Sequence, residues 1–283
     1  MPRRKKKKES LFIRFFTFIG KAIVFVIVGI AKAIYYIFKG IISAIKSISN
    51  KSVKSAKDVK VEKEVKKSQP KGNAKFEALV PVETRKGDFA DFESRLDKDS
   101  LIVAIAGRRG SGKSALGFKL MENIHANSSR PCFALGVKQS VIPRWIRSID
   151  SLDDVDDSGV VLVDEGAVAF GSRSSMSAKN RELGKLLAVA RHKDLTLFFV
   201  TQNTGMIDKN VLNLCDTIIL KVGSLLQEKM ERSVMKDMYK TANDALQPVD
   251  KKSHCYVFDS DYEGLVKVPL PSFWSSKVSK NRA

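Results

Sequence analysis

Short apolar runs and helical stretches alternate along residues 101–271. The apolar runs are bounded by glycine, proline or polar residues, and they form the centres of segments 101–106, 131–137, 159–167, 195–203 and 217–221. Runs of about four to eight residues with such boundaries are typical of strands that are buried on both faces of a sheet. Their alternation with helical stretches predicts an α/β domain with a mostly parallel sheet.

Three further elements complete this expected domain. The segment 141–149 predicts a short helix, and residues 225–246 carry apolar side chains at helical spacing, which predicts an outer helix. Near the end of the chain, a few polar residues separate the apolar segments 253–259 and 264–271. This spacing predicts a C-terminal β-hairpin.

Residues 11–48 have a different pattern, an almost unbroken apolar stretch behind the basic tail of residues 1–10. The stretch carries five cations spaced 7, 11, 7 and 7 residues apart, namely Arg14, Lys21, Lys32, Lys39 and Lys46. Because these spacings are close to whole helical turns, all five cations fall on one stripe of an apolar helix. Lysine stems can run along such a surface and place their ammonium groups at lipid phosphates. The pattern of residues 1–48 therefore predicts association with an anionic membrane.

The sequence leaves open whether residues 11–48 cross the membrane or lie at its surface. The longest run without charge, from Ala22 to Ala31, is ten residues, whereas a transmembrane helix needs about 20. Both flanks are rich in lysine, and a single crossing would export one of them against the positive-inside rule. A helix in the plane of the interface, or a short hairpin near Gly29, is therefore favoured over a transmembrane helix with snorkelling lysines. A soluble core helix is the least favoured alternative.

The positive charge of the chain is concentrated before residue 76. Residues 1–75 contain 20 Lys and Arg against 4 Asp and Glu, while the remaining residues contain 30 against 27, for a total net charge of +19. Residues 49–75 repeat lysine with few large apolar side chains, which predicts a flexible linker. The domain expected at 76–283 is thus nearly neutral, so the high pI does not identify it as a basic nucleic-acid-binding domain.

Cysteine and histidine usage argues against a metal cluster. Cys132, Cys215 and Cys255 are widely separated and form no CxxC pair, and the three histidines are scattered as well. Each cysteine lies in or beside an apolar run. We therefore expect buried, reduced thiols, as in a cytosolic environment.

The segment 107–114, GRRGSGKS, matches the pattern G-x-x-x-x-G-K-[ST] of a Walker A motif. An apolar strand precedes it and a helical stretch follows it, which is the context that a phosphate-binding loop requires. We expect Lys113 to contact the β- and γ-phosphates of ATP and Ser114 to supply an oxygen ligand to Mg²⁺. The predicted nucleotide-binding residues are Gly107, Arg108, Arg109, Gly110, Ser111, Gly112, Lys113, Ser114 and Ala115.

A Walker B motif and a polar strand end follow in the sequence. Four apolar residues precede Asp164 and Glu165. We expect Asp164 to hold Mg²⁺, through water, and Glu165 to activate the attacking water. The segment 195–203 places Gln202 at a strand end, where we interpret it as a sensor of the γ-phosphate or its water. The alternative for Gln202 is an ordinary polar residue that ends a strand.

The order of these motifs resembles the FtsK/HerA superfamily of P-loop ATPases, in particular viral genome-packaging ATPases and the related Zot-like ATPases. The resemblance spans about residues 99–274 and rests on the Walker A segment, on Asp164 and Glu165, and on the segment 181–202 that ends in Gln202. It implies a three-layer α/β sandwich of the P-loop NTPase fold, of the type with an additional glutamate. It also implies a ring-shaped homo-oligomer that acts on double-stranded DNA.

In rings of this superfamily an arginine from one subunit completes the neighbour's site, and Arg191 is the candidate that the resemblance favours here. Arg173 and Arg181, in the polar segment 171–181, are alternatives, and a plain surface role for Arg191 is another. We expect the segment 171–181 to form a loop that either faces the pore of a ring or lies in solvent.

Three functions fit this sequence. The preferred prediction is a membrane-tethered ATPase motor, with its ATPase domain on the cytoplasmic side, that translocates double-stranded DNA to package a viral genome. A second is an ATPase for membrane-linked virion assembly or for protein or filament export. A third is a nucleotide-switched membrane scaffold, which Glu165 disfavours because a water-activating carboxylate implies turnover.

Overall fold

The computed structural model of the chain describes residues 69–70, 72–164, 176–202, 213–224, 233–275 and 278. The predicted membrane segment and Glu165 lie outside these ranges, as does most of the predicted linker. Within the ranges, no helix is long and apolar enough to cross a membrane. All of these residues belong to one unit of the chain, Val65–Ala283.

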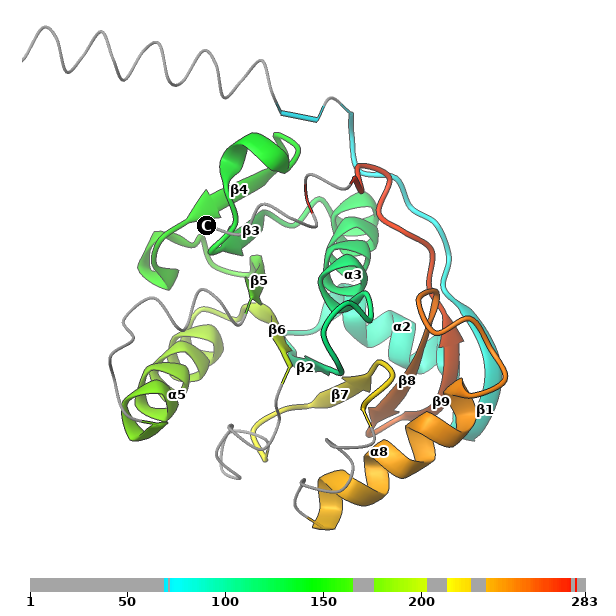
Figure 1. The fold of residues 1–283 in the computed structure, drawn as a ribbon. Helices are drawn as coiled ribbons and strands as arrows, with labels where there is room; N and C mark the ends of the chain where they lie inside the picture. Colours follow the sequence, from blue (N-terminus) through cyan, green and yellow to red (C-terminus); the bar gives the residue numbers. More distant parts are fainter. Residues whose placement is uncertain are drawn as a thin grey trace, which may run out of the picture. The chain divides into compact units, whose positions relative to one another are not determined.

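A nine-stranded sheet with the order β1-β9-β8-β7-β2-β6-β5-β3-β4 forms the centre of the described unit (Figure 1). Neighbouring strands are parallel from β7 to β4, which includes β2 (Ile102–Ala106), β3 (Cys132–Leu135), β4 (Ile146–Ile149), β5 (Val160–Asp164), β6 (Thr196–Thr201) and β7 (Thr217–Leu220). The remaining pairings are antiparallel and add β8 (His254–Asp259), β9 (Tyr262–Lys267) and β1 (Val80–Gly87). The predicted parallel strands and the C-terminal hairpin are thus confirmed.

Helices cover both faces of the sheet, as Figure 1 shows. On one face lie α2 (Phe89–Lys98) and α3 (Lys113–Ser128), and on the other lie α5 (Met176–His192) and α8 (Ser233–Leu246). Alternate strand residues supply the two cores, because successive side chains of a strand point to opposite faces. On β2, Ile105 belongs to the core with α3, whereas Ile102 belongs to the core with α5. The result is the predicted three-layer arrangement.

The segment 141–149 is not the helix that its sequence predicts. It contains the end of a short 3₁₀ turn, η1 (Gln139–Val141), and the edge strand β4, which pairs parallel with β3. Pro143 lacks the backbone N–H that a helix would use. Ile146 and Ile149 are buried at the two ends of a strand of four residues, and their spacing of three residues resembles that of a helix.

The loop predicted at 171–181 is helical where the structure describes it. Helix α5 begins at Met176, so the second half of this segment is helical. Residues 171–175 lie outside the described ranges. A second short 3₁₀ turn, η2 (Leu152–Asp154), precedes β5.

All three cysteines are free thiols. Cys132 and Cys255 are buried, and Cys215 is half-buried. Burial raises the pKa of Cys255 to about 11 and that of Cys215 to about 12, and it raises the pKa of Cys132 further. The expectation of buried thiols is confirmed for Cys132 and Cys255, whereas Cys215 is half-buried.

Helix α3 is covered on its outer side by residues 72–79, here named the N-terminal arm. Asn123 of α3 accepts a hydrogen bond from the Glu77 backbone N–H at 3.2 Å and donates one to the Glu77 carbonyl at 2.8 Å. The Lys119 ammonium donates to the carbonyl of Lys75 at 3.1 Å. These bonds pair backbone groups of the arm, as a neighbouring strand would. Because they include Lys75, the contacts of this unit begin before residue 76, the predicted start of the domain.

Glu122 of α3 binds the N-terminal arm and a segment near the C-terminus. Its carboxylate accepts from the Lys119 ammonium at 3.0 Å, and neither side chain is more than 1% exposed. It also accepts from the Lys75 backbone N–H at 3.3 Å and from the backbone N–H and hydroxyl of Ser272. Ser272 belongs to residues 268–275, here named the C-terminal segment. Since the charges are paired and hydrogen-bonded, the fold tolerates their burial.

Replacing Glu122 by alanine is expected to lower the free energy of unfolding by about 3–5 kcal/mol, because the Lys119 ammonium would stay buried without its carboxylate. Urea unfolding of the full-length chain, followed by tryptophan fluorescence, measures this unit because Trp145 and Trp274 are the only tryptophans of the chain. Glu83→Ala, on the exposed strand β1, is the matched control and should change stability by less than about 0.5 kcal/mol. Equal effects of the two substitutions would contradict a structural role for the buried pair.

Candidate active site

The Walker A segment forms a tight turn between β2 and α3. Gly107, Gly110 and Gly112 have φ angles of 149°, 77° and 92°, which favour glycine. A Cβ on Gly107 would also lie 2.9 Å from the carbonyl oxygen of Lys221 on the neighbouring chain segment. Helix α3 begins at Lys113 directly after this turn, so its first free N–H groups and the positive end of its dipole border the loop.

The loop has the features of a phosphate cradle. Lys113 is 5% exposed, and its ammonium donates to the carbonyls of Gly107 at 2.8 Å and Arg108 at 2.9 Å. The Ser111 hydroxyl is buried without a hydrogen-bond partner among the described residues. A Cβ on Gly110 would meet no atom within 4 Å, so the backbone there is open to approach by a ligand. These observations fit the phosphates that the motif predicts.

The two predicted magnesium ligands lie together. The Ser114 hydroxyl donates to an Asp164 carboxylate oxygen at 3.2 Å, although the two residues are 50 positions apart in the chain. Asp164 ends β5 and is 6% exposed. A hydroxyl and a carboxylate are the hard oxygen ligands that Mg²⁺ prefers, and Mg²⁺ takes the rest of its shell from water and phosphate. The residues therefore fit the predicted ion.

Gln202 lies between the Walker A loop and Asp164. Strand β6 pairs with β2 on one side and with β5 on the other, so that Thr201 is opposite Ala106 and Val200 is opposite Asp164. Gln202 follows directly and is half-buried. Since parallel strands end at the same edge of a sheet, the structure gathers these predicted residues at one edge. Glu165 follows Asp164 in the chain but lies outside the described ranges.

Arg191 is placed at the opposite edge of the sheet. It lies in the last turn of α5, before β6 begins, and its guanidinium is exposed with a long hydrogen bond of 3.4 Å to the Leu214 carbonyl. The length of β6, roughly 17 Å for its six residues, separates it from the P-loop edge. The structure therefore does not bring Arg191 to Lys113 within one chain, and a role toward a neighbouring subunit stays a prediction. Arg173 and the side chain of Arg181 lie outside the described residues.

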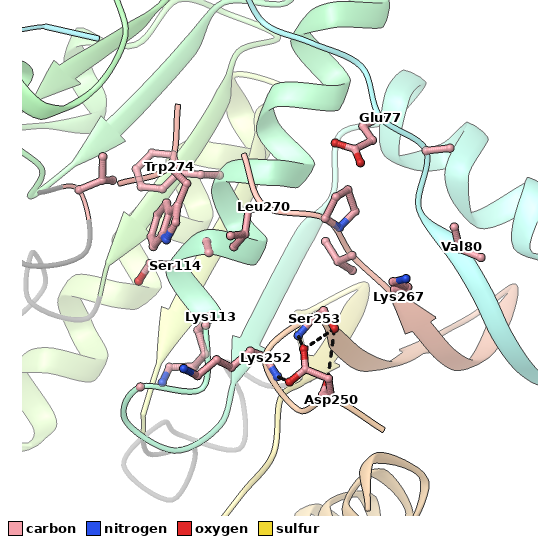
Figure 2. Close-up of a pocket in the computed structure, with 18 of the residues that line it drawn as sticks. Glu77, Val80, Lys113, Ser114, Asp250, Lys252, Ser253, Lys267, Leu270 and Trp274 are labelled. Atoms are coloured by element: carbon pink, nitrogen blue, oxygen red, sulfur yellow. Dashed lines mark hydrogen bonds between the residues drawn. The ribbon is translucent and has the colours of Figure 1, made fainter. Parts of the chain in front are cut away.

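A cavity of about 710 Å³ borders the P-loop, a size typical of small-molecule sites. Figure 2 shows two ends of this cavity. Lys113 shares one end with Asp250, Lys252 and Ser253, while Leu270 and Trp274 of the C-terminal segment lie at the other, beyond Ser114. Sequence reasoning missed the walls formed after residue 249, because no motif marks them and only the fold brings them to the loop.

These features define a P-loop NTPase. They are the strand β2, the glycine-rich turn before Lys113, the helix that begins at Lys113, and the Asp164 carboxylate at a nearby strand end. No family model and no curated protein matches the sequence. The chain is similar to the solved structure of the genome-packaging NTPase B204 from Sulfolobus turreted icosahedral virus 2 in complex with ATP-gammaS, with 16% identity and a TM-score of 0.44 over 60% of this chain and 98% of that chain.

Two further structures extend the comparison. The DNA-packaging ATPase B204 of Sulfolobus turreted icosahedral virus has the same 16% identity and TM-score of 0.44, over 60% of this chain and 98% of that one. EssC (ATPases 2 and 3) from Geobacillus thermodenitrificans has 12% identity and a TM-score of 0.39, over 71% of this chain and 46% of that one.

Nucleotide binding is expected to change the fluorescence of Trp274, which lines the cavity. Titration of the full-length chain with a non-hydrolysable ATP analogue and Mg²⁺ should give a saturable change that Trp274→Phe abolishes. Trp145 stacks on His125 with ring centroids 4.9 Å apart and does not line the cavity. Trp145→Phe should therefore keep the change, and a signal that follows Trp145 instead would show that the nucleotide binds elsewhere.

Proposed function

We propose that this chain is a membrane-tethered ATPase motor that hydrolyses ATP at the P-loop and uses the energy to translocate double-stranded DNA, as in viral genome packaging. The observation that carries the proposal is the meeting of the Ser114 hydroxyl and the Asp164 carboxylate, 3.2 Å apart, beside the loop around Lys113. This is the geometry in which one Mg²⁺ ion and the end of a triphosphate can be held together.

In this proposal each residue of the site has its own role in hydrolysis. The loop amides and Lys113 bind the phosphates, and Lys113 leaves its two carbonyl partners to do so. Ser114 and Asp164 would hold Mg²⁺, which would neutralise charge on the phosphate oxygens. Glu165 takes a proton from the attacking water, and Gln202, at the end of β6 between the two motifs, acts as a sensor that bonds the γ-phosphate or that water.

The choice of DNA rests on the resemblance of the motifs to genome-packaging ATPases, which also implies a ring of identical subunits. The tether rests on the apolar stretch 11–48 with its single stripe of cations and on the basic flanks. In this proposal the linker holds the nearly neutral ATPase domain beside the cytoplasmic side of the membrane. An ATPase for membrane-linked assembly or export shares the tether and the site, so the polymer that is moved decides between the two.

ATP hydrolysis by the full-length chain is expected to rise severalfold when double-stranded DNA is added. Glu165→Gln should lower hydrolysis by about 100- to 10,000-fold, with or without DNA, because the water loses its general base. Phosphate release measured over a range of DNA concentrations tests both expectations. Heparin of matched charge is the control, because the basic residues 1–75 would bind any polyanion.

The outcomes separate the candidate functions. Stimulation by DNA but not by heparin supports the translocation motor. Hydrolysis that depends on Glu165 but ignores DNA would replace it with the assembly or export ATPase. Nucleotide binding without turnover would leave only the nucleotide-switched scaffold.

A further inference from the structure

The turn formed by residues 250–253 faces the Walker A loop across the cavity. This turn joins α8 to β8, and it lines the cavity with Asp250, Lys252 and Ser253. The approach is close, because a Cβ built on Gly112 would lie 3.4 Å from the carbonyl oxygen of Lys252. In Figure 2 the turn and Lys113 lie at the same end of the cavity. Two segments about 140 residues apart in the sequence therefore form one charged end.

The shape of this turn is fixed by its own hydrogen bonds. The Asp250 carboxylate accepts from the backbone N–H groups of Lys252 and Ser253, each at 3.2 Å, and from the Ser253 hydroxyl at 2.6 Å. The bond with Ser253 is the main reason that the pKa of Asp250 lies below its ordinary value. Because these bonds occupy both carboxylate oxygens, Asp250 is a structural acceptor of the turn although it lines the same cavity.

A buried lysine, Lys221, holds the turn by hydrogen bonds to its backbone. Lys221 follows β7 and is 1% exposed, and its ammonium donates to the carbonyls of Lys252 and His254, both at 2.6 Å. Its pKa lies below the ordinary value because the group is desolvated. The same side chain runs beneath the Walker A loop, since a Cβ on Gly112 would lie 3.8 Å from the Lys221 ammonium nitrogen. Lys221 thus sets the distance between the turn and the loop.

The geometry points to Lys252 as a second lysine that binds the polyphosphate of the nucleotide, with Lys221 as the residue that positions it. This inference rests on the proposed function, because it assumes a nucleoside triphosphate at the P-loop. The Lys252 side chain is exposed and lines the cavity beside Lys113. The backbone of Lys252 is fixed by the turn, while its ammonium is a compact charge on a flexible side chain. Such a group can follow phosphates that shift during hydrolysis.

Besides Asp250, two acidic side chains line the cavity, Glu77 and Asp164. Asp164 accepts from the Ser114 hydroxyl at 3.2 Å. Glu77 lies in the N-terminal arm, near Val80 and away from the turn (Figure 2). Its carboxylate lies 4.0 Å from the Lys119 ammonium instead. The charged end of the cavity thus offers two lysines, Lys113 and Lys252, to an anionic ligand.

Replacing Lys252 by alanine tests the inference, with Lys251→Ala as the matched control. Lys251 is the exposed neighbour on the same turn and does not line the cavity. For the full-length chain with Mg²⁺, Lys252→Ala should weaken binding of a non-hydrolysable ATP analogue by roughly tenfold, the loss of one charge-assisted contact. Binding of AMP, which lacks the β- and γ-phosphates, should stay unchanged. Lys251→Ala should change neither affinity.

Each other outcome has a definite meaning. Equal affinities of the two alanine variants for the ATP analogue would overturn the inference and leave the proposed function intact. An equal loss for AMP and the analogue would overturn contact with the polyphosphate. If the wild-type chain binds neither nucleotide, the proposed function fails, and this inference fails with it.

The positioning role of Lys221 has a separate test. Lys221→Met should weaken the binding of the ATP analogue more than the binding of AMP. In a chain that already carries Lys252→Ala, it should cause no further loss of affinity for the analogue. Fully additive losses would show that Lys221 does not act through Lys252 and would overturn this role. A purely structural role would lower the affinities for AMP and for the analogue alike.

Discussion

The rest of the structure depends on the junction between β2 and α3, where a buried strand becomes a buried helix within a short glycine-rich turn. The positive φ angles in this turn allow the reversal. Gly117 then lets α3 lie close to β5, since a Cβ there would come within 2.4 Å of the Leu162 side chain. The meeting of Ser114 with Asp164 is therefore set by the packing of α3 on β5, and the loop conformation alone would not produce it.

The helix that carries Lys113 also binds the N-terminal arm and the C-terminal segment. Asn123 binds the N-terminal arm, and Glu122 binds both the arm and the C-terminal segment. The arm continues from the linker, and the C-terminal segment forms the apolar end of the cavity with Leu270 and Trp274. Helix α3, which begins at the phosphate-binding loop, is therefore in contact with both segments.

Much of the sheet and the centre of the site could be predicted from the sequence, because both depend on local patterns. Continuous apolar runs mark strands that are buried on both faces, and the Walker motifs mark strand ends that meet at one edge. The edge strands could not be predicted in this way. Strand β1 is exposed at all eight residues, and its two valines, Val80 and Val82, are followed by polar residues only up to its terminal glycine. In β4, Ile146 and Ile149 have a spacing that also fits a helix, so pairing with β3 decides its conformation.

The second wall of the site could not be predicted because it depends on contacts between distant segments. A lysine after the apolar run of β7 looks like an ordinary charged residue at a strand end, yet Lys221 is buried and binds only carbonyl groups among the described residues. A buried ammonium loses its hydration, and an apolar side chain of similar length would avoid that cost. What an apolar side chain would not do is hold the carbonyls of Lys252 and His254 in place. The buried ammonium of Lys221, despite its desolvation cost, is therefore best explained by the turn that it fixes beside the phosphate-binding loop.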